Sequence, residues 1–150
     1  MAARDDDPYP VAIGLLARRE HSAREIERKL TERGFERGQV AECIGRLQQE
    51  RLQSDERFAE SYLRVRSGKG YGPVRIRAEL AERGVAGAVI DEQLATMDEE
   101  WQQLAVEVRR KRFGNGVPQD YQERARQARF LQYRGFAGEQ LRGLFNDDWD

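Results

Sequence analysis

The chemistry that this sequence offers most clearly is cationic. Between Ser61 and Ala78 the chain has no acidic residue, and this stretch carries five cations and a loop tyrosine: Arg64, Arg66, Lys69, Tyr71, Arg75 and Arg77. Cations interleaved with aromatic rings and glycines are typical of surfaces that follow phosphates. Ordinary surface arginines around a core tyrosine, Tyr62, would give the same pattern, and both interpretations stay open.

A second excess of positive charge lies between Leu104 and Arg134, where eight basic residues face three acids. Its densest part is the run Arg109, Arg110, Lys111 and Arg112. Of the 26 basic residues in the chain only three are lysines, and arginine suits planar contacts with carboxylates and phosphates. We predict that the two stretches form two contact patches for a partner.

Catalytic and metal chemistry has little support. His21, the only histidine, is interpreted as a solvated residue at a helix junction, and Cys43, the only cysteine, as a small core residue. One of each cannot build the usual zinc sites. The glycines of loop 68–72 allow a phosphate nest, but the Rossmann and P-loop spacings are missing. We therefore predict no catalytic, cofactor-binding or metal-binding residue and do not expect an enzyme.

The elements that must position these cations are helices that repeat along the chain. Gly34, Gly84 and Gly135 each follow an arginine, precede an apolar residue, and have a leucine four residues earlier. A spacing of 50 and then 51 residues indicates a tandem array, which usually presents an extended surface to a partner. Each glycine is expected to end a helix with positive φ, and each leucine to lie in the core.

Local signals divide each repeat into three helices. Pro10 is expected to open the first helix, and Ser54 to cap the fourth. Capping boxes are predicted at Ser22–Glu25, Thr96–Glu99 and Asp120–Glu123. The chain is therefore predicted to be all-α, with nine helices in three triplets. The expected organisation is a disordered acidic N-terminus at 1–9, three-helix repeats at 10–53, 54–97 and 98–146, and an acidic tail at 147–150.

Composition narrows the class of protein and of partner. No apolar run approaches the roughly 20 residues of a membrane span, and the first residues lack the apolar part of a signal peptide. The single cysteine fits a reducing compartment, so a soluble cytoplasmic protein is expected. The net charge of −1 hides a charge of +4 over residues 8–145. This charge is low for a pure nucleic-acid binder and fits better a protein partner that itself holds DNA.

The residues assembled so far resemble the RecX family of regulatory proteins, bacterial modulators of the RecA recombinase. The order D-x-x-F-A followed by G-P-x-R-I-x-x-E-L is the more specific part of the resemblance. The third repeat departs from the others in having Gln127 eight residues before its glycine, where the first two have isoleucine. The matching residues span the chain from about Pro10 to Phe145: Leu16, Arg19–Ser22, Glu25 and Leu30; Asp55–Ala59, Tyr62 and Arg66; Gly70–Pro73, Arg75, Ile76, Glu79 and Leu80; Arg129–Leu131 and Arg134–Phe136.

The resemblance implies an elongated, curved array of three three-helix repeats that acts as a monomer without a cofactor. It also implies binding to the RecA filament on single-stranded DNA, with contact to the DNA mainly through the filament. Inhibition of the recombinase, ATPase and coprotease activities, which limits recombination and the SOS response, would follow. If Arg75 and Arg77 are contacts, reversing their charges should weaken inhibition and leave the helices intact.

An alternative is a helical module that binds nucleic acid directly through the same arginines. Its binding to naked DNA would fall steeply with salt.

Overall fold

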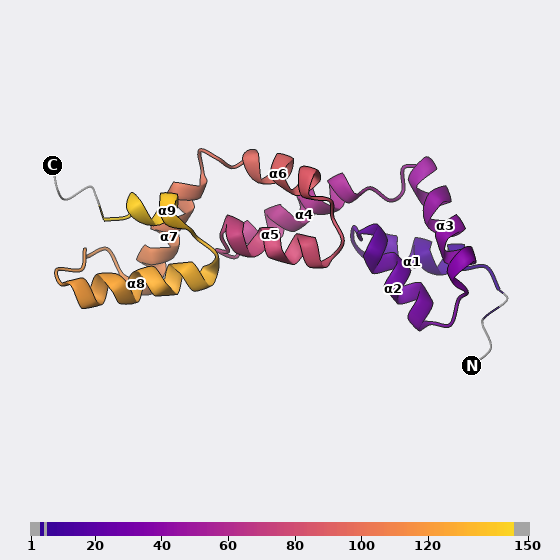
Figure 1. The fold of residues 1–150 in the computed structure, drawn as a ribbon, viewed down its shortest axis with the longest axis horizontal. Coiled ribbons are helices and arrows are strands. Elements are labelled where there is room, and N and C mark those ends of the chain that lie inside the picture. The colour runs from indigo at the N-terminus through magenta and orange to yellow at the C-terminus, as the bar shows by residue number, and fades with distance from the viewer. Residues whose placement is uncertain (1–3, 5, 146–150) are drawn as a thin grey trace. The chain divides into compact units, whose positions relative to one another are not determined.

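The computed structural model of the protein describes residue 4 and residues 6–145. Residues 1–3 and 5 of the predicted N-terminal segment, and the predicted tail 147–150, lie outside the described residues. The all-α prediction is confirmed for the described part, in which the only β-type pairing is an isolated bridge between Arg4 and Phe35. The described helices follow one another as in Figure 1: α1 (Tyr9–Arg18), α2 (Ala23–Glu32), α3 (Arg37–Gln49), α4 (Asp55–Gly68), α5 (Pro73–Glu82), α6 (Gly87–Ala95), α7 (Trp101–Phe113), α8 (Tyr121–Arg134) and α9 (Gly138–Arg142).

The packing divides the chain into two compact units. The first unit is Met1–Tyr62 with Leu80–Ile90, and the second is Leu63–Glu79 with Asp91–Asp150. Helices α4, α5 and α6 each contribute residues to both units. The boundary between the units therefore falls within the middle repeat.

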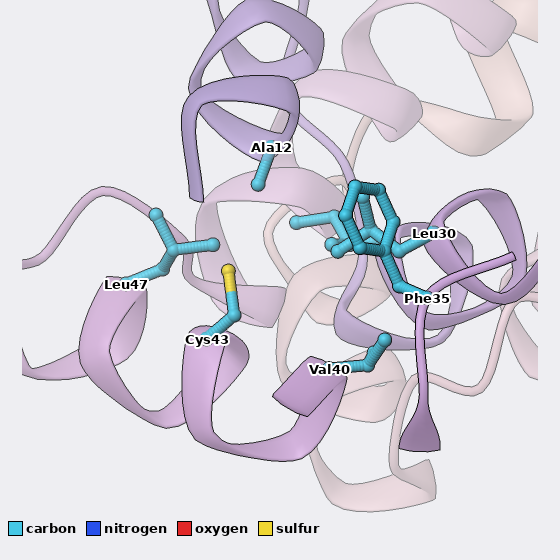
Figure 2. Packing of buried hydrophobic residues seen from close by; sticks show 7 residues of the cluster. Ala12, Leu30, Phe35, Val40, Cys43 and Leu47 are labelled. Atoms are coloured by element: carbon cyan, nitrogen blue, oxygen red, sulfur yellow. The ribbon is translucent and has the colours of Figure 1, made fainter. Parts of the chain in front are cut away.

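A core cluster of the first unit is built from side chains on α1, α2 and α3 and from Phe35 between α2 and α3. Figure 2 shows Ala12, Leu30, Phe35, Val40 and Leu47 converging, with the sulfur of Cys43 directed into the same cluster. Cys43 is buried, as predicted, and burial raises the pKa of its thiol. Since the neutral thiol packs like a small apolar side chain, this cysteine serves the core.

The three predicted glycine turns are confirmed. Gly34, Gly84 and Gly135 have φ of +92°, +80° and +103°, a region that residues with a Cβ rarely adopt. The leucine four residues before each glycine is fully buried. In each turn the apolar residue after the glycine donates its backbone N–H to the carbonyl of that leucine, as in a Schellman motif: Phe35 to Leu30 at 3.2 Å, Val85 to Leu80 at 3.1 Å and Phe136 to Leu131 at 3.0 Å.

The predicted helix starts are mostly confirmed. The Ser22–Glu25 capping box is complete, and Ser54 accepts the N–H of Arg57. At Asp120–Glu123 only half of the predicted box forms: Asp120 accepts the N–H of Glu123, while the Glu123 carboxylate accepts from Arg126 and Gln127. Helix α1 begins at Tyr9, one residue before the predicted Pro10.

The predicted capping box at Thr96–Glu99 is wrong. The Thr96 hydroxyl donates to the carbonyl of Gln93 at 2.6 Å, so it bonds back to α6 rather than forward to α7. Helix α7 begins later, at Trp101, without a side-chain cap. Threonine hydroxyls compete for nearby carbonyls in this way, so a spacing pattern alone cannot assign a cap.

Each glycine turn also docks on another segment of its own unit. In the first unit, Arg4 donates its N–H to Gly34 at 2.8 Å, and the Ser22 hydroxyl at the start of α2 donates to the Arg83 carbonyl at 2.7 Å. In the second unit, the N–H of Gly72 at the start of α5 donates to the Arg134 carbonyl at 2.8 Å. The start of the second helix of one repeat thus receives the glycine turn of the next.

Candidate functional site

The first cationic stretch lies on the end of α4, the following loop and the start of α5. Three of its five cations are already paired. Arg66 makes a two-pronged contact with Glu79 at 2.9 Å for each bond, Arg75 meets the same carboxylate at 3.3 Å, and Arg77 pairs with Asp91. These pairs neutralise much of the charge that the sequence places here. Arg64 and Lys69 are exposed and form no ion pair with a described residue.

Tyr71 holds the loop of this stretch in place. The guanidinium carbons of Arg66, Arg75 and Arg134 lie 3.9, 4.6 and 5.1 Å from the centroid of its ring. Such cation–π contacts contribute about 0.5–2 kcal/mol each, depending on how far they are withdrawn from water. The ring is half-buried beneath these arginines, so its role within the second unit is to position the loop.

The loop is also tied to the end of α8. Gly72 and Val74 donate their N–H groups to the carbonyls of Arg134 and Gly135 at 2.8 and 2.9 Å. The Arg134 guanidinium donates to the Lys69 carbonyl at 3.3 Å. These bonds hold Lys69 next to α8, although the two segments are far apart in the sequence.

The second predicted patch lies on the last turns of α7, and its four residues differ in exposure. Arg110, Lys111 and Arg112 are exposed and form no ion pair with a described residue. Their charges lie at the carboxyl end of the helix, where cations are favoured by the helix dipole.

Arg109 departs from the prediction of a surface contact. It is only 4% exposed, and its guanidinium donates to the Gly116 carbonyl and to Gln127 Oε1, both at 3.2 Å. The guanidinium therefore holds the α7–α8 loop and is not presented to a partner.

The two predicted patches meet in one hollow of about 480 Å³ within the second unit. Lys69 of the first patch lies on its wall together with Lys111 and Arg112 of the second. We call these three side chains the rim cations. The full lining is Gly68, Lys69, Gly70, Leu104, Glu107, Val108, Lys111, Arg112, Phe130 and Arg134. The lining combines four cations and one carboxylate with the apolar side chains of Leu104, Val108 and Phe130.

Three residues of this region were not predicted as site residues. Arg134 lines the hollow, and the sequence marked it only as the arginine before a repeat glycine. Phe130 packs edge-on against Phe113 at 5.3 Å, with the guanidiniums of Arg112 and Arg134 over its ring at 5.6 and 5.3 Å. Tyr133 is 75% exposed, and its ring lies 5.4 Å from the Arg75 guanidinium. An aromatic residue in a helical repeat carries no signal of its exposure, so these roles required the structure.

Positive charge is concentrated in the unit that holds the hollow. Residues 63–79 and 91–145 carry 14 lysines and arginines against 10 acids. The described residues of the first unit carry 12 against 13. The second unit is therefore the cationic one, and the hollow brings together three of its cations that form no ion pair with a described residue.

His21 is not the solvated residue predicted from the sequence. It is 1% exposed, its Nδ1 lies 3.1 Å from the Arg19 carbonyl, and its Nε2 lies 2.9 Å from the Lys29 ammonium. Because an ammonium can only donate, Nε2 accepts and Nδ1 carries the proton. Burial lowers the pKa of His21, and the charges of Arg19 and Lys29 lower it further. Among the described residues, no group of three histidine, cysteine or acidic side chains could hold a metal ion.

Comparison with protein families identifies each of the three repeats. Three family models match in chain order: the first three-helix domain of RecX at residues 9–47, the second at 54–94 and the third at 98–143. The chain belongs to the RecX family. The cationic hollow thus lies in a RecX-family protein, on elements of its second and third three-helix domains.

Similar proteins of the RecX family carry the name "Regulatory protein RecX". The one from Halorhodospira halophila is 50% identical over 131 residues, which are 87% of this chain and 81% of that protein. The one from Stenotrophomonas maltophilia is 41% identical over 147 residues, covering 98% of this chain and 90% of that protein. These matches support a regulatory role for this chain.

A solved structure of a RecX protein supports the fold. The crystal structure of RecX from Lactobacillus salivarius matches with a TM-score of 0.80 at 21% identity, covering 93% of this chain and 92% of that one. In the part of the RecX-family chain that the structure describes, no helix has the length and apolar character to cross a bilayer.

Proposed function

We propose that this protein binds the RecA filament on single-stranded DNA and inhibits its recombinase, ATPase and coprotease activities. It would thereby limit recombination and the SOS response in the cytoplasm. Membership of the RecX family and the regulatory names of the relatives support this proposal. The protein acts as a monomer, by occupying the filament rather than by catalysing a reaction.

The observation that carries the proposal is the gathering of the rim cations in one hollow. Lys69 comes from the first predicted patch, and Lys111 and Arg112 come from the second. None of the three forms an ion pair with a described carboxylate, whereas Arg66, Arg75 and Arg77 pair with Glu79 and Asp91. Unpaired cations retain more of their attraction for a negatively charged partner. We therefore assign the main contact to the rim cations, with Arg64 and Arg110 as further exposed cations outside the hollow.

Binding to the filament, without any catalysed reaction, is a sufficient mechanism for such a regulator. A protein of three linked repeats can contact a polymer at more than one place, and linked contacts strengthen each other without a strong single contact. Binding to one assembly state of the filament shifts the equilibrium toward that state by mass action. Weak electrostatic contacts are therefore enough for inhibition at adequate concentration.

Charge reversal at the rim tests the proposal. In the double variant Lys69→Glu/Lys111→Glu, we expect half-inhibition of RecA ATP hydrolysis on single-stranded DNA to need at least about tenfold more protein, since like charges now oppose the partner. Arg37→Glu is the matched control, because Arg37 is exposed on α3 and has no ion pair with a described residue. Equal inhibition by the double variant and the wild type would reject the rim as the contact.

The charge reversal first predicted at Arg75 and Arg77 is a less clean test. A glutamate at position 75 would face Glu79, and one at position 77 would face Asp91. Loss of inhibition in that variant could follow from disturbed helices, so its helical content needs a parallel measurement.

Direct binding to nucleic acid is a second candidate function, favoured by the exposed ring of Tyr133 beside Arg75. Base stacking on an aromatic ring contributes about 1–3 kcal/mol per base. If this function operates, Tyr133→Ala weakens binding to naked oligothymidylate, and Tyr121→Ala, which removes an exposed tyrosine at the other end of α8, leaves it unchanged. Affinity that does not fall as salt rises would exclude phosphate contacts.

A further inference from the structure

The hollow combines two kinds of surface that one ligand would have to satisfy together. Its lining has an apolar part, from Leu104, Val108 and Phe130, and a cationic part, from the rim cations and Arg134. A volume of about 480 Å³ is within the range of roughly 300–1,000 Å³ that is usual for binding pockets. A fitting ligand therefore has an apolar group for the interior and negative charges around that group.

A strand of nucleic acid fits this surface poorly. Stacking platforms need an open ring face, but the guanidiniums of Arg112 and Arg134 already lie over the Phe130 ring, and Phe113 packs against its edge. Leu104 and Val108 offer no flat face for a base.

An acidic peptide fits the same features. A leucine-like side chain can fill the aliphatic interior, and flanking aspartates or glutamates can pair with cations that come from both sides of the hollow. Lys69 follows α4 and Lys111 lies on α7, so carboxylates on either side of one apolar residue find partners. Glu107 can accept a hydrogen bond from the N–H groups of a peptide, which a phosphodiester does not offer.

We propose that the hollow binds an acidic peptide segment of a protein partner, with one apolar side chain inserted between the rim cations. This inference rests on the proposed function, because it names the chemistry by which the protein component of the filament would be recognised. It places that recognition on a polypeptide and not on the DNA that the filament carries.

Fluorescence anisotropy of labelled probes with the whole protein tests this inference. The main probe is a short peptide with a central leucine flanked by aspartates. Its controls replace the leucine by serine or the aspartates by asparagine, and oligothymidylate tests the nucleic-acid alternative. We expect the main peptide to bind, and each control peptide to bind at least about tenfold more weakly, since each lacks one of the two required features.

The variants locate the binding. Lys69→Glu and Lys111→Glu should each weaken binding of the main peptide by at least about fivefold, while Arg37→Glu should leave it within about twofold of wild type. If circular dichroism shows a glutamate variant to be unfolded, the corresponding glutamine variant takes its place. A peptide that does not bind, an equal affinity for the control peptides, or binding that is indifferent to both lysines would overturn the inference.

Binding of oligothymidylate that depends on Lys69 and Lys111, without binding of the peptide, would assign the hollow to nucleic acid instead. These outcomes are separable from the proposed function, because the peptide assay contains no recombinase. A wild-type protein that inhibits RecA but ignores the peptide would retain the function and lose this inference.

Discussion

Arg109 and Gln127 form a buried polar pair in the third repeat. Gln127 occupies the position of Ile26 and Ile76, and its Oε1 accepts from Arg109. The other end of the same amide donates to Glu123, which also accepts from Arg126. These bonds lower the pKa of Glu123 to about 2, so the carboxylate remains charged at all physiological pH values. Gln127, which replaces the isoleucine of the other repeats, thus provides a hydrogen-bond acceptor for the buried Arg109.

Replacing Gln127 by the isoleucine of the other two repeats should therefore destabilise the protein. Gln127→Ile removes an acceptor from a buried guanidinium, and we expect the free energy of unfolding to fall by about 1–3 kcal/mol. Arg109→Met/Gln127→Ile should lose less than the sum of the two single variants, because each single variant already removes the bond between the two side chains. Urea unfolding followed by circular dichroism gives the three values. Strict additivity would show that the pair is not coupled.

His21 makes stability depend on pH. The pKa of His21 is lowered in the folded chain, so the unfolded chain binds the proton more readily. The contribution of His21 to the free energy of unfolding should be fully present above the ordinary histidine pKa of about 6.5. It should be lost as the pH drops from there through the lowered pKa. Protonation would also set two donors, His21 and Lys29, against each other. Urea unfolding from pH 8 to pH 5 should show this fall in the wild type and a smaller one in His21→Gln, whereas equal slopes would remove His21 as the cause.

At the scale of elements, the starts of α2 and α5 are docking points for the next glycine turn. Helix α8 differs from both, because it has 14 residues where α2 and α5 have 10. Three of its four extra residues lie at its amino end. The positions that receive a glycine turn in the other two repeats therefore lie inside the helix in the third. Atypical terminal repeats are common in tandem arrays.

A substitution at Gly72 tests whether the start of α5 docks on the glycine turn of the next repeat. A Cβ at this position would lie 2.5 Å from the Gly135 carbonyl oxygen, a backbone atom that cannot rotate away. We expect Gly72→Ala to lower the free energy of unfolding by about 1–3 kcal/mol. Gly14→Ala is the control, since nothing lies within 4 Å of its added Cβ and alanine favours helix α1 by about 0.5–1 kcal/mol. If both variants gained stability in thermal unfolding, the close approach at Gly72 would be refuted.

Glycine turns and core leucines could be predicted from the sequence, whereas the bond made by Thr96 and the pairings between helices could not. The turn at Gly84 and the burial of Leu80 depend on neighbouring residues and were both confirmed. The pairing of Arg66 with Glu79 joins two helices, and the burial of Arg109 depends on Gln127 in the following helix. The sequence marked every cation of both patches as a contact. These long-range pairs occupy some of those cations within the protein.

At the scale of the whole molecule, a balanced total charge conceals an uneven distribution. The excess of cations belongs to the second unit, and the rim cations bring part of that excess to one hollow. We keep 10–53, 54–97 and 98–146 as the proposed limits of the three repeats. The regulatory role follows from membership of the RecX family. The proposed contact follows from which cations of the second unit form no ion pair with a described residue.

Cosedimentation with RecA filaments formed on single-stranded DNA tests the central claim most directly. The account predicts that the wild type and Arg37→Glu pellet with the filaments, that Lys69→Glu/Lys111→Glu stays largely in the supernatant, and that naked single-stranded DNA retains much less protein than the filaments do. A double variant that pellets as well as the wild type, or a wild type that ignores RecA-coated DNA, would contradict it.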